Sequence, residues 1–338
     1  MELQYAENFA VDYYEDGYKM LTTLPDSKRY LLVPEGQPVP QGLDEDVSIL
    51  QEPLQNIYLV ASGVMDMFAS VDAVEQIRFS GQKQENWYIQ TAKDAMAAGD
   101  MIYAGKYSKP DYELLVSEGC DLAIENRMIT HSPEVVEMLQ SFDIPVMIEY
   151  SSYEQHPLGK VEWVKFFGAL TGREAEAEEA FAEQTEILEE VESGEKTGKT
   201  IAFFYVTSNG LIQVRQSTDY IPKLIELAGG RYIFENLEDS GSGRSTLNMQ
   251  VEDFYAGAKD ADILIYNSSI DGGVTTVDEL IGKCNILKDF KAVQEGQVYC
   301  TTNDMYQQSM AIGYLLQDMH TVLTDDDTAK LRYLFLLQ

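Results

Sequence analysis

The chain of 338 residues contains little of what many enzymes and nucleic-acid-binding proteins use. It has three cysteines and three histidines, with no CxxC pattern and no zinc-ligand spacing. Its 24 lysines and arginines face 57 aspartates and glutamates, which gives a net charge of −33. This balance argues against nucleic acid as a partner and against a polybasic membrane surface. We therefore expect no protein-held metal, no cofactor and no nucleic-acid contact.

Long hydrophobic runs are also missing. No window approaches the roughly eighteen uninterrupted apolar residues that a membrane-spanning helix needs. The opening segment MELQYAENFA lacks the charged and apolar regions of a signal peptide. These observations leave two alternatives, a cytosolic protein or one whose targeting segment has been removed.

Catalytic motifs are absent as well. The sequence has no GxGxxG opening a helix, no GxxxxGK[ST], no GxSxG and no HExxH. The glycine-rich GSGRST at 241–246 lacks a phosphate-loop lysine, and we interpret it as a mobile loop. The histidines, His131, His156 and His320, lie in three different contexts, so a Ser-His-Asp nucleophile is unsupported. We expect a protein that is not an enzyme.

What the sequence does contain is a repeated alternation of short apolar runs with helical segments. With 45% hydrophobic residues the chain is long enough for two domains with cores. The alternation predicts an α/β fold of two lobes, each with a mainly parallel sheet flanked by helices. Before it, a β-rich pair at 19–24 and 29–33 predicts an edge hairpin, and PEGQPVPQG at 34–42 predicts a loop.

The segment Tyr150–Gly172 stands between the two alternating halves. Pro157 suits a first helical turn, and apolar residues recur at helical spacing up to Leu170. We interpret 157–170 as one long connector helix, which predicts an N-terminal lobe at 1–155, connector helices at 156–194 and a C-terminal lobe at 195–338. An ordinary crossover helix is the alternative.

Polar and aromatic side chains follow the predicted strands of both halves. Ligands of open α/β sheets bind at the carboxyl ends of strands, where such side chains gather. Guanidinium groups and aromatic rings suit an anionic or planar ligand. The candidate ligand-binding residues are Ser62, Met65, Tyr103, Lys106, Tyr107, Arg127, Met128, Arg215, Asn267 and Tyr306.

Several stretches of the sequence resemble one family. AGKYSKPDYELLVSEGCDLAIENRMI, SSYEQHPLGKVEWVKFFGALTG, LIELAGG and the late DILIYN strand are similar to ABC-transporter substrate-binding proteins of the iron-siderophore, haem and cobalamin class. The resemblance implies a bilobed, periplasmic-type binding protein that delivers a chelated metal to a membrane permease. It also implies an extracytoplasmic, lipid-anchored protein, although the lipobox cysteine is missing from this sequence.

The resemblance further implies two docking residues. Glu113 and Glu252 stand near the starts of corresponding helices in the two halves, from which such proteins offer one carboxylate per lobe to the permease. We expect a monomer that binds an iron-siderophore, with cobalamin or haem as alternatives. A two-domain α/β enzyme acting in an interlobe cleft stays open as a different class. In an exported protein Cys284 and Cys300 could form a disulfide, and two free thiols are the alternative.

Overall fold

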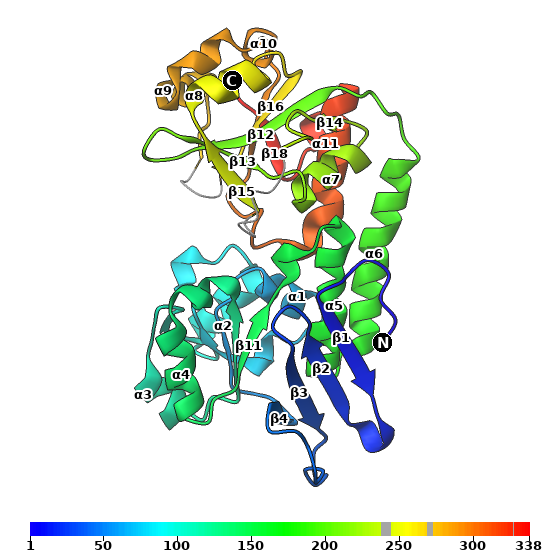
Figure 1. Cartoon of the computed structure of the whole chain (residues 1–338), viewed down its shortest axis with the longest axis vertical. Coiled ribbons are helices and arrows are strands. Elements are labelled where there is room, and N and C mark those ends of the chain that lie inside the picture. The colour runs from blue at the N-terminus through cyan, green and yellow to red at the C-terminus, as the bar shows by residue number, and fades with distance from the viewer. Residues whose placement is uncertain (238–244, 269–272, 327) are drawn as a thin grey trace. The chain divides into compact units, whose positions relative to one another are not determined.

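The computed structural model (Figure 1) describes residues 1–237, 245–268, 273–326 and 328–338. The chain forms two compact units. The first comprises residues 1–154, 158–182 and 307–310, and the second comprises residues 155–157, 183–306 and 311–338. Residues 241–244 of the expected mobile loop lie outside the described part.

The first unit is built on a five-stranded sheet in which every pair of neighbours is parallel. Its order is β11 (Val146–Glu149), β10 (Leu122–Asn126), β5 (Ile57–Leu59), β6 (Ile77–Ser80) and β7 (Ile102–Tyr103). The strands are short and mostly buried, as expected for a parallel sheet covered on both faces. The prediction of a parallel α/β sheet is confirmed.

Short helices follow the strands of this sheet. They are α1 (Val64–Ser70), α2 (Gln90–Ala98), α3 (Tyr112–Ser117) and α4 (Pro133–Ser141). The small hairpin of β8 (Gly105–Lys106) and β9 (Lys109–Pro110) lies between β7 and α3. Residues from strands and helices, among them Tyr58, Leu115 and Leu139, form one apolar cluster, so burial of these side chains fixes the helices on the sheet.

A second sheet of the first unit contains the predicted hairpin. It runs in the order β1 (Phe9–Tyr13), β2 (Lys19–Thr23), β3 (Lys28–Val33) and β4 (Val47–Gln51). The hairpin of β2 and β3 exists, but its description as an edge was wrong, because β1 and β4 occupy the edges. The stretches FAVDY and VSILQ are too short to stand out by periodicity alone.

The N-terminal sheet is held on α5 (Pro157–Thr171) by rings and by buried carboxylates. Phe9 lies 4.9 Å from the ring of Trp163 and 5.3 Å from that of Phe166. The fully buried carboxylate of Glu162 accepts hydrogen bonds from the backbone N–H groups of residues 4, 5 and 6, at 2.8–2.9 Å. Glu154 accepts those of residues 7 and 8 and the indole N–H of Trp163. Two carboxylates thus satisfy five consecutive backbone donors.

The helix that carries the chain from one unit to the other differs from the expected one. Every residue of α5 from Leu158 to Leu170 is buried, and this stretch belongs to the first unit. The boundary falls between Ala182 and Glu183, inside α6 (Glu174–Glu192). An apolar residue on every face marks a core helix, whereas the acidic α6 keeps only a stripe of buried residues.

The second unit contains a mixed sheet. Its order is β15 (Thr246–Met249), β13 (Ile212–Arg215), β12 (Thr200–Val206), β16 (Ile263–Tyr266), β17 (Val298–Thr301) and β18 (Leu334–Leu336), and β14 (Arg231–Tyr232) also pairs with β12. β12, β14, β16 and β17 are parallel, as predicted, and β13, β15 and β18 are antiparallel additions.

The helices of the second unit are α7 (Tyr220–Leu227), α8 (Val251–Ala258), α9 (Val277–Lys283), α10 (Lys291–Gln294) and α11 (Ile312–Thr324). One apolar cluster includes Phe204, Phe254 and Leu264. Cys284 and Cys300 both belong to it and are not bridged to each other, so the alternative of two thiols describes the structure. Nowhere in the described ranges is a helix long and apolar enough to cross a bilayer.

Candidate functional site

The parallel strands of the first unit end at one edge of their sheet, where we expected ligand-binding side chains. Ser62 follows β5 and is half-buried, and Tyr103 ends β7 with 40% of its surface exposed. Arg127 and Met128 follow β10, and both are exposed. Since carboxyl ends of parallel strands share an edge, these four residues lie along it.

Arg127 takes part in an aromatic cluster at this edge. Its guanidinium carbon lies 4.6 Å from the centroid of the Tyr153 ring, which in turn meets Tyr150 at 6.4 Å in an edge-on arrangement. The two tyrosines come from the segment after β11, the neighbour of β10 in the sheet. A cation held over a ring beside exposed apolar groups can receive a planar or anionic ligand. Sequence reasoning missed both tyrosines, because it assigned them to the connector.

The other candidates of the first unit differ in accessibility. Met65 is fully buried in α1, so its side chain is out of reach of a ligand in this structure. Lys106 is exposed and Tyr107 half-buried, both at the β8–β9 hairpin. That hairpin is fixed to the sheet because the hydroxyl of Tyr58 donates to the carbonyl of Gly105, at 2.9 Å.

In the second unit the structure brings three candidates together. The hydroxyl oxygen of Tyr306 accepts a hydrogen bond from Nδ2 of Asn267, at 2.7 Å, and another from Nη2 of Arg215. Asn267 follows β16, and Arg215 ends β13. These residues are 39 and 91 positions from Tyr306 in the sequence, so only the fold unites them.

The charge of Arg215 is buried and compensated. Its side chain makes an ion pair with Asp219, Nη1 to Oδ2 at 3.4 Å, and its guanidinium carbon lies 5.6 Å from the ring of Tyr306. Burial opposes the charged form, but Tyr306 and Asp219 outweigh burial and raise the pKa of Arg215. Burial also raises the pKa of Tyr306, and Arg215 and Asn267 offset part of that rise. The cluster therefore presents a permanent cation beside a neutral phenol.

The backbone of Arg215 is fixed as firmly as its side chain. Its N–H donates to the hydroxyl of Tyr232 at 3.0 Å, and that hydroxyl donates to the carbonyl of Arg215 at 2.8 Å. The next residue, Gln216, is fully buried, and its side-chain amide has no hydrogen-bond partner within the described part of the chain. Sequence reasoning missed Asp219, which directly precedes α7, and Tyr232, which belongs to β14.

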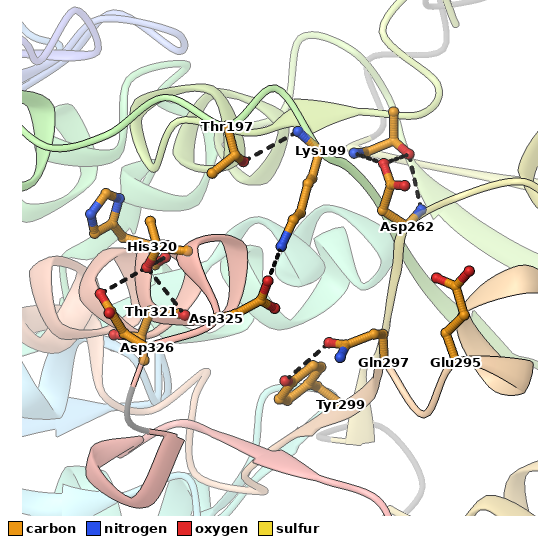
Figure 2. Close-up of polar contacts among 12 residues, drawn as sticks. Thr197, Lys199, Asp262, Glu295, Gln297, Tyr299, His320, Thr321, Asp325 and Asp326 are labelled. Atoms are coloured by element: carbon orange, nitrogen blue, oxygen red, sulfur yellow. Dashed lines mark hydrogen bonds and ion pairs between the residues drawn. The ribbon is translucent and has the colours of Figure 1, made fainter.

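The opposite edge of the second sheet, at the amino ends of the parallel strands, has its polar groups paired among themselves (Figure 2). Asp262, before β16, accepts from the N–H and hydroxyl of Thr200 at 2.7 and 2.8 Å. Lys199 donates to Asp325 at 2.5 Å, at the end of α11. Such short internal pairs stabilise the edge and leave these groups engaged with each other.

The two expected docking carboxylates have the local geometry we anticipated. Glu113 lies in the first turn of α3 and Glu252 in the first turn of α8, and both are exposed. A carboxylate in a first turn is favoured by the helix dipole. Asp111 caps α3 by accepting from the N–H of Leu114, which leaves Glu113 free of a capping role.

In the residues that the structure describes, no group of three or more His, Cys, Asp or Glu side chains is placed to hold a metal ion. The first unit instead carries a cation and tyrosines near the ends of its parallel strands, and the second carries a cation, a tyrosine and an amide on its mixed sheet. This combination defines a solute-binding protein of the two-unit α/β type.

The chain belongs to the periplasmic binding protein family, whose model matches residues 67–305. This is a family of binding proteins, so the open alternative of a two-domain enzyme is set aside. The N-terminal sheet, at residues 9–51, precedes the matched region.

Individual similarities agree with the family. An uncharacterized lipoprotein of Methanocaldococcus jannaschii is 24% identical, over 95% of this chain and 81% of its own. The periplasmic haem-binding protein of Vibrio cholerae has a similar structure, with a TM-score of 0.62, 14% identity and coverage of 79% of this chain and 98% of that one. An ABC-type Fe3+-hydroxamate transport system from Saccharomonospora viridis gives a TM-score of 0.60 at 17% identity, covering 80% and 93%. At these identities the solved structures establish the fold.

Proposed function

We propose that the protein binds an iron-siderophore or a similar anionic metal chelate outside the cytoplasm and delivers it to an ABC permease. The observation that carries this proposal is the cluster of Arg215, Asn267 and Tyr306 in the second unit. Ferric chelates of hydroxamates, catecholates and carboxylates present oxygen atoms with negative charge on their surface. A fixed guanidinium with a phenol and an amide supplies charge-assisted hydrogen bonds to such atoms.

The first unit supports the same ligand class. Arg127 provides a second guanidinium, and the exposed ring of Tyr153, which packs on buried Tyr150, offers apolar surface beside it. Exposed Tyr103 and Met128 extend that surface along the sheet edge. A chelate with an apolar backbone and charged oxygens would satisfy both kinds of group.

The site residues support haem and cobalamin less directly. Both are large, flat macrocycles whose iron or cobalt takes an axial ligand from the protein or from their own side groups. The cluster around Arg215 offers a buried cation and polar atoms, and Tyr306 has its oxygen engaged by two donors. We therefore rank an oxygen-rich anionic chelate first.

The test is a titration of the purified chain with four probes: a ferric hydroxamate, a ferric catecholate, haemin and cyanocobalamin. Tryptophan fluorescence and visible absorbance report binding, and a thermal shift confirms that the folded state is stabilised. The proposal expects a ferric chelate to bind and Arg215→Gln to weaken it by about 10-fold or more. Arg231→Gln is the matched control, because Arg231 is exposed and pairs with Glu235 alone among the described carboxylates. Tight binding of haemin with no binding of ferric chelates would refute the proposed ligand class.

Lipid anchoring and docking complete the proposal. The Methanocaldococcus jannaschii relative is a lipoprotein, and an anchored protein would release its ligand close to a permease. Exposed Glu113 and Glu252, one on each unit, would supply the carboxylates that the permease recognises. We also propose that the protein acts as a monomer.

A further inference from the structure

The second unit contains a cavity that none of the proposed ligand-binding or docking residues line. It has a volume of about 380 Å³, within the range of small-molecule sites. α6 and α11 form two of its walls, and Lys330 and Arg332, shortly before β18, form the third. The lining includes Lys330, Arg332, Thr321 and Gln317. We propose that this cavity binds a small oxyanion, either a phosphate or a carboxylate.

The cavity lining is richer in cations than the chain as a whole. In a chain with 57 acidic and 24 basic residues, two cations only two positions apart line the same space. Thr321 and Gln317 on α11 add a hydroxyl and an amide that can donate to an anion. Two carboxylates, Asp318 and Glu190, also line the cavity. Their contacts decide how strongly they repel an anion.

The charge of Asp318 is partly offset, because its carboxylate oxygens are engaged by backbone donors. Its oxygens accept hydrogen bonds from the backbone N–H groups of Arg332, Tyr333 and Leu334, at 2.9, 2.6 and 3.0 Å. The buried carboxylate thereby fastens the returning segment to α11. Because it binds the backbone of Arg332, it fixes the position of this residue whatever side chain stands there.

The guanidinium of Arg332 is held in place separately. Its central carbon lies 3.9 Å from the centroid of the Tyr314 ring, and the hydroxyl of Tyr314 donates to Glu183 of α6 at 2.5 Å. The described residues place no carboxylate oxygen within 4.0 Å of the guanidinium nitrogens. A stacked arginine whose donors face no carboxylate at contact distance is suited to bidentate binding of an oxyanion.

The wall formed by α11 is also held in place. Figure 2 shows His320 and Thr321 on α11, close to the ion pair of Lys199 with Asp325 that ends the helix. Nδ1 of His320 lies 2.9 Å from the carbonyl oxygen of Ala228, so this nitrogen is the donor. α6 is joined to α11 because Gln184 accepts from the N–H of Gly313 at 2.9 Å. The cavity therefore exists before a ligand arrives, which lowers the cost of binding.

Glu190 supplies the discriminating test. It is exposed and belongs to α6, whereas both cations belong to the segment after α11. If the ligand is an oxyanion, Glu190→Gln removes a repulsive charge and should tighten binding. If the ligand were a zwitterion with its ammonium group at Glu190, the same change would weaken binding.

The experiment measures binding of inorganic phosphate and of citrate by calorimetry, at constant ionic strength set with chloride. We expect saturable binding of at least one of them, on the order of 1 mM or tighter. Arg332→Gln and Lys330→Gln should each weaken it roughly 10-fold, since each removes a charge-assisted contact. Lys288→Gln, an exposed lysine elsewhere in the second unit, should leave it unchanged.

Two results separate this site from the chelate site. Arg215→Gln should leave phosphate affinity unaltered, and an equal loss in that variant with none in Arg332→Gln would assign the anion to Arg215 and overturn the proposal. Absence of binding of both anions to the unmodified chain, or weaker binding after Glu190→Gln, would overturn it too. Unchanged thermal melting of Arg332→Gln without ligand shows that the fold is intact.

Discussion

Glu125 offers the sharpest test of the physical reasoning, because the structure leaves its carboxyl group buried without compensation. It lies on β10 and is fully buried, and neither carboxyl oxygen has a hydrogen-bond partner in the part of the chain described. Burial raises its pKa well above that of an ordinary glutamate. The titratable groups that interact with it, Tyr58 and Tyr112, have pKa values raised above that of a free tyrosine and stay neutral below pH 9.

The sign of the pH dependence follows from linkage. An unfolded glutamate ionises near pH 4.3. Below that pH, Glu125 is protonated in both the folded and the unfolded state and causes no loss of stability. Above it the unfolded state releases the proton while the folded state retains it. Stability should therefore fall by about 1.4 kcal/mol for each pH unit between the unfolded and the folded pKa. Above the folded pKa the loss becomes constant.

Glu125→Gln isolates this effect, because the amide has the shape of the protonated acid and does not titrate. Urea unfolding at pH 5, 6, 7 and 8 should show the smallest gain in stability for the variant at pH 5 and an increasing gain above it. Glu134→Gln, which removes an exposed carboxylate of α4, is the control and should follow the parent at every pH. Parallel stability curves for the parent and Glu125→Gln would refute the reasoning.

Three further changes test other contacts. Glu162→Ala removes the acceptor of three backbone N–H groups and should cost about 3–5 kcal/mol in urea unfolding, so a loss below 1 kcal/mol would contradict the role of this carboxylate. Gly105→Ala places a Cβ 2.3 Å from the carbonyl oxygen of Lys109 at a φ of +87° and should lower stability by about 1–3 kcal/mol. Glu113→Lys with Glu252→Lys should abolish delivery to the permease and leave chelate affinity intact, and normal uptake by that variant would remove the docking role.

The sequence alone predicted the parallel strands and suggested candidate site residues for one physical reason. Short apolar runs separated by helical periods specify parallel strands, and parallel strands bring their carboxyl ends to one edge. Asn267, directly after β16, was therefore a candidate, and it meets Arg215 through Tyr306. That Tyr306 joins these two residues could not be predicted, because periodicity does not show where the chain runs before α11.

Two further structural features were not predicted. One of them had a recognisable sequence signal and the other had none. β13, which ends in Arg215, is antiparallel to β12, and the turn between them contains Gly210 at a φ of +80°. The pair TIAFFYV and LIQVR around Ser-Asn-Gly is typical of a hairpin, so this strand was predictable. The clamp of Glu162 on residues 4–6 was not, because it joins positions about 157 apart.

The assignment of α5 shows why a helix's length is a weaker guide to its role than its polarity. A helix that spans two units must keep a polar face wherever neither unit covers it, and α6 does so with exposed glutamates such as Glu179 and Glu189. α5 has no such face, since even Lys160 and Lys165 on it are buried. Lys165 is held by Glu162 at 3.5 Å and by Glu178 of α6 at 3.0 Å. Buried lysines that need fixed partners require an enclosing core, so the sequence pattern of α5 indicates the interior of one unit, and the passage to the next falls to the acidic helix that follows.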